Sequence, residues 1–307
     1  MRRSTVIFDV LVFLGLVLAA SNAHAQGDGP RVQLLSPVGA NVLAPTYLDL
    51  SSNFNFAQDI LVEGADITSR VGVATYIRFF RIGDRFAQVW VNPIWGSVGG
   101  AVDVDQTTIH VPSVSGLADP YLAMRVGLVG APALTPAEFV KHTQRFQLHA
   151  LVGAYVPVGD YDSNRPLNLG TNRWAIRLGL PMVVPFGKPG GMTYLEINPG
   201  AVFYTTNSDP FGADRRTQDP LFIVESHLSH DFTPTFWGSV DLRYQTGGET
   251  TTDGVADDNR IGQLGGGVSL GYWFNRSLGL QASYGDIIAK NDDSSGSLLR
   301  VRLSWIF

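Results

Sequence analysis

The sequence has no cysteine, few charged residues and no apolar run long enough to cross a membrane as a helix. The absence of cysteine excludes disulfides, thiolate metal sites, thiol catalysis and redox switching. Charged residues make up 16% of the chain, against the ~25% that is typical of soluble domains. The apolar run from Val10 to Ala20 covers about eleven residues, whereas a transmembrane helix needs roughly 20. An α-helical membrane protein is therefore excluded.

The first residues have the layout of a cleaved signal peptide. Arg2 and Arg3 supply a positive start, the run Val10 to Ala20 supplies the apolar centre, and small residues end at Ala25. The alternative, a membrane anchor, is disfavoured because the apolar run is too short. We therefore predict export of the chain, with cleavage between Ala25 and Gln26.

The composition of the exported chain argues against a nucleic-acid partner and is compatible with a membrane barrel. Removing Arg2, Arg3 and Asp9 leaves 22 − 2 = 20 basic and 27 − 1 = 26 acidic residues, a net charge of −6. Nucleic acid requires a basic surface instead. The 34 glycines and the aromatic content of 11% suit the tight turns and aromatic girdles of a β-barrel in a membrane.

The last ten residues, Leu298 to Phe307, alternate between apolar and polar side chains. Successive side chains of a strand point to opposite faces, so the apolar residues share one face and Arg300 and Arg302 share the other. In a membrane barrel the apolar face meets lipid and the polar face meets a wet lumen. The aromatic ending resembles the terminal strand of bacterial outer-membrane barrels. Trp305 and Phe307 are therefore predicted to form the signal that the barrel-assembly machinery recognises.

Similar alternation recurs along the chain from Tyr47 onward. It predicts about twelve strands, an even number, as in single-chain bacterial barrels. Connections after odd strands are long and polar, whereas most of those after even strands are tight, which places the N-terminus in the periplasm. The predicted fold is an all-β, antiparallel transmembrane β-barrel of about 12 strands, with short periplasmic turns and longer extracellular loops. Its parts are the signal peptide (1–25), an irregular N-terminal lead-in or plug (26–46) and the barrel (47–307).

Three segments depart from simple strands and turns. Residues 26–46 contain several Gly and Pro residues and form either a plug inside the lumen or a mobile periplasmic lead-in. Their terminal position favours the lead-in. The polar stretch Gly99 to Leu117 is the longest loop and the best candidate to fold inward. Thr135, Pro136 and Glu138 have the spacing of a capping box at the start of a short helix.

The polar face of the predicted strands defines the lumen of the barrel. An excess of arginine there would favour anionic or hydrogen-bonding solutes through its electric field. The structural alternative, favoured for any single residue, is that these side chains only hydrate the interior and pair across strands. The lumen-lining candidates are Arg78, Arg125, Arg145, His149, Arg173, Arg177, Glu196, Glu225, His227, Asp241, Arg243, Arg300 and Arg302.

Turn-forming residues stand where three strands begin just after an outer loop. The candidates for a shared role at the extracellular mouth are Asp119, Asn172, Trp174 and Asp219. Asp and Asn side chains also cap backbone amides in turns, and this structural interpretation is favoured.

Five stretches of the chain match the pattern of a known family. They are VEGADITSRVGVATYIR from Val62, SVSGLADPYLAMRVGL from Ser113, GAPALTPAEF from Gly130, PVGDYDSNRPLNLGTNRWAIR from Pro157 and QDPLF from Gln218. The chain thereby resembles the outer-membrane family labelled "putative MetA pathway of phenol degradation", often called simply "transporter". The resemblance extends over most of the exported chain. It implies a link to the metabolism of aromatic compounds, without a particular substrate.

The sequence favours an outer-membrane barrel that passively passes small solutes, including hydrophobic or aromatic, phenol-like ones. The alternatives are a closed structural or adhesive barrel and, less favoured, a barrel phospholipase. The histidines available to an enzyme are His110, His142, His149, His227 and His230, and none lies in a nucleophile motif.

No enzyme activity, cofactor or metal is therefore predicted. His227 and His230 are three residues apart on a strand and so point to opposite faces, which does not suit a metal site. The expected partners are outer-membrane lipid, the barrel-assembly machinery and a small-molecule solute, and not nucleic acid.

Overall fold

The structure, a computed structural model, describes residues 27–55, 60–62, 64–104, 107–188 and 190–307. The predicted signal peptide and its cleavage site lie outside these residues. The barrel strands are β1 (Asn41–Ser52), β4 (Ala65–Ile82), β5 (Arg85–Val104), β6 (Thr107–Val129), β7 (Gln147–Tyr155), β8 (Ala175–Gly179), β9 (Met182–Lys188), β10 (Gly191–Tyr204), β12 (Leu221–Asp231), β13 (Phe236–Gly247), β16 (Ile261–Trp273), β17 (Leu278–Lys290) and β18 (Gly296–Ile306). The connections contain β2 (Phe54–Asn55), β3 (Ile60–Leu61), β11 (Arg216–Gln218), β14 (Thr250–Thr252), β15 (Val255–Ala256) and the helix α2 (Pro136–Phe139). Helical segments of the described chain are all too short or too polar to cross a membrane.

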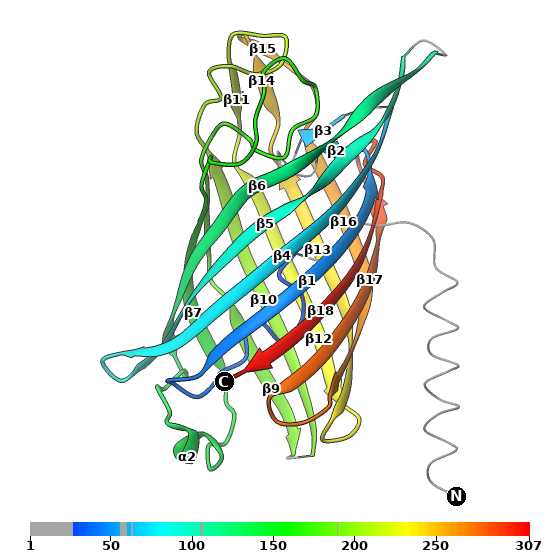
Figure 1. Ribbon diagram of the computed structural model, residues 1–307. Helices are drawn as coiled ribbons and strands as arrows, with labels where there is room; N and C mark the ends of the chain where they lie inside the picture. The colour runs from blue at the N-terminus through cyan, green and yellow to red at the C-terminus, as the bar shows by residue number, and fades with distance from the viewer. Residues whose placement is uncertain (1–26, 56–59, 63, 105–106, 189) are drawn as a thin grey trace, which may run out of the picture.

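The barrel strands form one closed antiparallel sheet (Figure 1). Each strand pairs with the next along the chain, and β1 pairs with β18 to close the sheet. Strands β8 and β9 both pair with β7 and β10, so they are two halves of one barrel strand, interrupted at Leu180 and Pro181. Counted this way, twelve strands close the barrel in the described part of the chain. The predicted fold class is confirmed.

The two ends of the barrel differ in their connections (Figure 1). At one end, here called the loop end, long connections join β1 to β4, β7 to β8, β10 to β12 and β13 to β16. At the other, here called the turn end, β4 and β5 are joined by Gly83 and Asp84 alone. The C-terminal Phe307 and the helix α2 also lie at the turn end. Most tight turns therefore lie at the turn end and most long loops at the loop end, as predicted, and the connection between β6 and β7 that contains α2 is the long exception at the turn end.

The longest predicted loop is a strand hairpin instead. Strands β5 and β6 remain paired from Gly100 opposite Val111 to Val104 opposite Thr107. The hairpin extends beyond the loop end of the barrel (Figure 1). The prediction that Gly99 to Leu117 folds inward was therefore wrong. Polar residues can continue a β-ladder wherever neither face is buried, so polarity alone did not mark a loop here.

Strand β18 shows how side chains divide between the two faces of the barrel. Leu299 and Trp305 are 44% and 50% exposed on the outer face, whereas Arg300 is only 4% exposed inside. Large apolar side chains continue this outer surface on the other strands, among them Leu122, Val152, Leu178, Phe222 and Val240. An apolar exterior around a polar interior is the arrangement that a lipid environment requires.

Strands β1 and β4 depart from this division at the turn end. Their apolar residues, such as Val42 and Ile77, line the lumen, while Arg78 points outward and donates to the carbonyl of Gly39 (2.8 Å) and to Oδ1 of Asn41 (2.9 Å). The prediction that Arg78 lines the lumen was wrong. A two-residue period does not say which face is inner, and here part of the lumen is itself apolar. β1 also begins at Asn41, before the predicted start at Tyr47.

The short helix α2 follows the predicted capping box. The Thr135 side chain accepts from the backbone N–H of Glu138, and the Glu138 carboxylate accepts from the backbone N–H of Thr135. The Thr135 hydroxyl (2.7 Å) and the Thr135 backbone N–H (2.8 Å) both donate to the Glu138 carboxylate, and these two hydrogen bonds hold the pKa of the Glu138 carboxyl below its usual value. The start of this helix is therefore determined by the local sequence alone.

Removal of Phe307 should reduce the amount of folded barrel in the membrane several-fold. Its backbone completes the β1–β18 seam through two hydrogen bonds with Asn41, of 2.8 and 3.0 Å, and its ring lies 4.8 Å from that of Trp305. We expect a weaker heat-modifiable band on a denaturing gel. Phe307→Tyr, which keeps both features, should insert normally. Equal insertion after the deletion would remove the case for an assembly signal at this residue.

Candidate functional site

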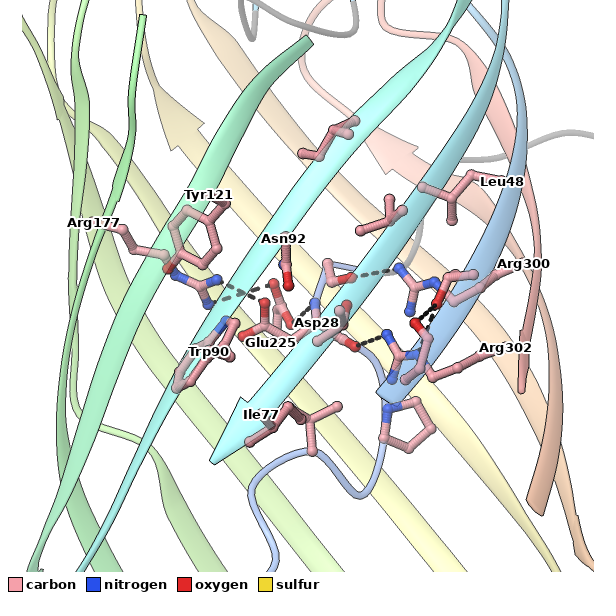
Figure 2. Close-up of a pocket in the computed structure, with 18 of the residues that line it drawn as sticks. Asp28, Leu48, Ile77, Trp90, Asn92, Tyr121, Arg177, Glu225, Arg300 and Arg302 are labelled. Carbon is pink, nitrogen blue, oxygen red and sulfur yellow. Dashed lines mark hydrogen bonds and ion pairs between the residues drawn. The ribbon is translucent and has the colours of Figure 1, made fainter. Parts of the chain in front are cut away.

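The lumen of the barrel contains the N-terminal plug, defined as Gly27–Ala40. It enters at the turn end, where the N–H of Val38 donates to Leu134 (2.8 Å) and the N–H of Gly39 donates to Phe79 (2.9 Å). The plug then runs up the interior of the barrel (Figure 2). The favoured prediction of a periplasmic lead-in was therefore wrong for these residues, and the alternative of a plug is what the structure shows. Hydrogen bonds from wall residues hold the segment inside.

The lowest part of the plug combines an apolar contact with a buried arginine. Leu35 packs in a cluster with Val42, Ala44, Phe79, Phe86 and Ala131. Above it, Nη1 of Arg125 donates to the backbone oxygen (2.6 Å) and to Oε1 (2.7 Å) of Gln33, and Nη2 donates to Gln88 (2.6 Å). The guanidinium of Arg125 is fully buried. Three hydrogen bonds of this kind compensate its loss of water.

The middle of the plug is held by opposite charges. Arg31 forms an ion pair with Asp231 (2.7 Å), and its guanidinium lies 4.4 Å from the centre of the Trp237 ring. The buried carboxylate of Glu196 accepts from the backbone N–H of Arg31 (2.7 Å) and of Gln33 (3.2 Å). Acceptors for the plug backbone thus come from the barrel wall, which replaces the pairing that a strand would provide.

The top of the plug ends among arginines (Figure 2). Arg177 donates to Oδ1 of Asp28 (2.9 Å), and Arg302 donates to the backbone oxygen of the same residue (3.1 Å). Arg300 donates to the backbone oxygen of Gly27, and the carboxylate of Glu225 accepts from the N–H of Asp28 (3.0 Å). Wall strands on opposite sides of the barrel therefore bind the same short stretch of the plug, Gly27 and Asp28.

Behind the plug, a chain of polar groups crosses four neighbouring strands. His227 Nδ1 lies 2.8 Å from Asp241, whose other oxygen accepts from Ser269 (2.6 Å), and Ser269 meets Ser283 at 2.8 Å. Glu225 lies 3.9 Å from Nε2 of His227. The hydroxyl of Ser269 bonds to a carboxylate, whereas a serine nucleophile is hydrogen-bonded to an imidazole. Hydrogen bonds that link four neighbouring strands rigidify the wall.

A second segment, here called the inner loop (residues 156–174, between β7 and β8), fills the lumen near the loop end. Its Leu167 and Leu169 are buried in an apolar cluster with Leu50, Ile67, Val71, Ile94, Val98, Ala118 and Leu298. Hydrogen bonds from the backbone and side chain of Asn164, together with Arg165, hold the pKa of the Asp162 carboxyl below its usual value. The inner loop, not the predicted Gly99–Leu117 stretch, is the connection that folds inward.

Replacing Asp119 by alanine should free the inner loop. Its carboxylate accepts from the N–H of Gly159 (2.8 Å), the N–H of Thr171 (2.9 Å) and the Thr171 hydroxyl (2.6 Å). Because bonds to a charged acceptor contribute about 1.5–3 kcal/mol each, we expect chymotryptic cleavage after Tyr161, in the inner loop, to be at least tenfold faster than in the wild type. Mass spectrometry of the fragments measures it. Asp219→Ala, an exposed acid beneath another loop, is the matched control, and equal cleavage of both variants would contradict the prediction.

A cavity of about 550 Å³ remains between the plug, the inner loop and the wall. Its walls change character along the barrel axis. Near the loop end they are apolar, with a further cluster of Phe54, Leu61, Ala175, Val202, Leu221, Ile223 and Ile261. At mid-height they carry the arginines that hold the plug, with Trp90 and Tyr121 beside them (Figure 2). The cavity thus has an apolar half near the loop end and polar groups at mid-height.

Eleven of the thirteen lumen candidates lie inside the barrel. They are Arg125, His149, Arg173, Arg177, Glu196, Glu225, His227, Asp241, Arg243, Arg300 and Arg302. Arg78 lies outside, as described above. Arg145 was also misplaced, because β7 begins only at Gln147 and Arg145 is exposed in the connection before it. Most of the eleven contact the plug or pair with one another across neighbouring strands, whereas Arg173 bonds to Gln218 and His149 lies against the ring of Phe86.

The four candidates for the outer mouth have separate positions. Asp119 is buried and holds the inner loop, whereas Asp219 is exposed and donates its N–H to Glu249 (2.9 Å). Asn172 adopts a left-handed backbone (φ 54°) and bonds to Asn207 (2.9 Å). Trp174 is 44% exposed on the outer face. They do not form one site. The bonds that Asp119 accepts from backbone N–H groups match the favoured structural interpretation, whereas the Asn172 side chain bonds to another side chain.

The plug residues Asp28, Arg31 and Gln33 were missed by the sequence analysis. A weak signal was present, since Asp28 and Arg31 place opposite charges within a Gly- and Pro-rich segment of a chain that is poor in charge. Nothing in a linear pattern says how far such a segment lies from the barrel wall. Only closure of the sheet brings Arg177 and Glu225 to it.

Comparison with solved structures places the fold among outer-membrane barrels. The COG4313 outer-membrane channel from Pseudomonas putida F1 is 23% identical, with a TM-score of 0.74 over 92% of this chain and 100% of that chain. The β-domain of the Bordetella autotransporter BrkA is 10% identical (TM-score 0.48, 87% and 99% covered). The transport unit of the Escherichia coli autotransporter AIDA-I is 9% identical (TM-score 0.48, 96% and 97% covered).

Comparison with sequences gives a family. No curated protein is significantly similar to the chain. A family model matches residues 39–302, which is most of the 307-residue sequence and includes all the barrel strands except the end of the last one. The five stretches singled out above all lie within this range. The protein therefore belongs to the family described as "Putative MetA-pathway of phenol degradation".

Proposed function

We propose that the protein is a gated channel of the bacterial outer membrane, through which small solutes pass when the N-terminal plug withdraws. The observation that carries the proposal is the way the plug is held. It is bound by side-chain hydrogen bonds and ion pairs, such as Arg177 to Asp28 and Arg31 to Asp231, and not by a β-ladder. Such contacts can be exchanged for water or solute without unzipping the barrel.

The proposed solutes are small hydrophobic or aromatic molecules of the phenol type. The cavity of about 550 Å³ lies within the range of about 300–1,000 Å³ that is usual for small-molecule sites. The two apolar clusters near the loop end favour entry of molecules with an apolar body. The family description, with its reference to phenol degradation, supports the same class of solute. The proposal also includes two partners. Lipid surrounds the apolar outer face, and the barrel-assembly machinery recognises the aromatic C-terminus.

Flux into proteoliposomes tests the proposal. The full-length exported chain, reconstituted in vesicles, should admit phenol and benzyl alcohol faster than empty vesicles do. Glucose, which is polar and larger, should enter more slowly. The alternative of a closed structural or adhesive barrel predicts no flux above empty vesicles for any solute, including in variants that weaken the plug. That result would contradict the channel proposal.

A further inference from the structure

The carboxylate of Asp28 occupies a pocket that the barrel wall provides. Arg177 on β8 donates to Oδ1 (2.9 Å), and Asn198 on β10 donates to Oδ2 (3.3 Å). Each oxygen thus has its own donor, and the two donor side chains are almost fully buried. A guanidinium is the preferred partner of a carboxylate in a protein interior. The wall therefore offers a carboxylate site, which the chain fills with its own plug.

Aromatic side chains lie directly beside this site. The ring centres of Trp90 and Tyr121 are 6.4 Å apart, and Tyr121 lies 4.7 Å from Tyr155. Figure 2 shows Tyr121 next to Arg177, with Trp90 and Asn92 on the adjoining wall. The side-chain oxygen of Asn92 is buried and has no hydrogen-bond partner within the described chain. An aromatic ring whose carboxylate faces Arg177 would meet these flat apolar surfaces and one polar atom.

The charge of the surrounding wall favours an anion. Six buried or half-buried arginines face the lumen from the wall, namely Arg125, Arg173, Arg177, Arg243, Arg300 and Arg302. The buried wall acids nearest to them are Glu196, Glu225 and Asp241. Glu225 lies between Arg243 (3.7 Å) and Arg177 (3.8 Å), and Asp241 is opposed by His227 (2.8 Å). Because two guanidinium groups share the one carboxylate of Glu225, withdrawal of Asp28 would leave excess positive charge at Arg177, which another anion can balance.

We propose that the Arg177–Asn198 pocket binds the carboxylate of an aromatic monocarboxylate solute and that Asp28 of the plug competes with that solute. The inference rests on the proposed function, because it requires the plug to leave. It adds a substrate class: an aromatic acid anion, with its ring against Trp90 and Tyr121. Binding of such an anion and release of the plug are then one exchange at Arg177.

Calorimetric titration of the full-length exported protein in detergent tests the competition. The probes are benzoate and its neutral counterpart benzyl alcohol. Asp28→Asn should increase the affinity for benzoate about tenfold or more, since a tethered competitor acts at millimolar effective concentration. Adding Arg177→Gln to that variant should lower the affinity for benzoate by about 10- to 100-fold. The affinity for benzyl alcohol should change little in both variants.

Two controls separate the carboxylate site from simple loosening of the plug. Gly29→Ala strains the plug but keeps the Asp28 carboxylate as a competitor, so it should raise benzoate affinity less than Asp28→Asn does. Arg177→Lys keeps the positive charge and provides a second test of the site in case the glutamine variant does not fold. It should lower benzoate affinity several-fold in the Asp28→Asn background. Folding of each variant is checked by its heat-modifiable band.

The outcomes distinguish this inference from the proposed function. A gain in benzoate affinity that requires both loss of the Asp28 charge and the presence of Arg177 supports the site, even if no variant passes phenol. Equal gains for benzoate and benzyl alcohol in Asp28→Asn would overturn it. A benzoate affinity that does not fall when Arg177 is replaced would also overturn it, even where phenol flux responds to changes in the plug.

Discussion

Replacing Gly27 and Gly29 together by alanine should raise phenol flux through the channel by about 30- to 150-fold. Gly29 has φ of +85°, where an L-residue costs roughly 1–2 kcal/mol, and its new Cβ would collide with Arg300. A Cβ at Gly27 would collide with the carboxylate of Glu225, which is itself held by the plug. Destabilising the closed state by about 2–3 kcal/mol raises the population of a minor open state by this factor.

The measurement is solute entry into proteoliposomes at equal amounts of folded protein. Gly83→Ala combined with Gly212→Ala is the matched control, because both glycines also have positive φ (+59° and +69°) but a Cβ there meets nothing within 4 Å. That control adds at least as much backbone strain outside the lumen, because both of its positions and only one of the tested pair have positive φ, and it should leave flux at the wild-type level. If the two double variants behave alike, the plug is not the barrier to passage.

Replacing Glu225 by glutamine should destabilise the barrel by about 3–5 kcal/mol, the usual cost of leaving one half of a buried ion pair behind. The carboxylate is 1% exposed and lies 3.8 Å from Arg177, 3.7 Å from Arg243 and 3.9 Å from His227. Arg177 retains Asp28 and His227 retains Asp241. Arg243 loses the only ion pair that it makes within the described residues.

The temperature at which the heat-modifiable band shifts gives the readout. It should fall clearly for Glu225→Gln and not for Asp214→Asn, which removes an exposed acid from a loop. The double variant Glu225→Gln with Arg243→Gln should regain part of the loss, because it removes the stranded cation as well. A double variant that is less stable than the single one would show that the ion pair is not the source of the effect.

The fold followed from local chemistry repeated along the chain. The decapeptide Leu298 to Phe307 carries apolar residues on one face and arginines on the other, and the structure directs them outward and inward in that order. The capping box of Thr135 and Glu138 is equally local and also appears as predicted. Each pattern needs only its own few residues, so a single sequence is enough to recognise it.

The errors share a different origin. Arg78 was placed inside because its strand alternates cleanly, but alternation is symmetric between the two faces, and the turn end of the lumen is apolar where β4 passes. The Gly99–Leu117 stretch was taken for a loop because it is polar, yet it continues two strands beyond the barrel. Neither the inner face of a strand nor the extent of a hairpin can be predicted before it is known what lies opposite each residue.

The sequence by itself determined the class of the protein: an even-stranded, antiparallel barrel with an apolar exterior and arginines facing inward. Tertiary structure alone decided what fills that barrel, because the contacts of the plug join residues far apart in the chain. Asp28 meets Arg177, 149 positions away, and Gly27 meets Arg300, 273 positions away. Such meetings depend on how the sheet curves and closes. Whether the lumen is open, blocked or selective is therefore a property of the closed barrel and not of any one strand.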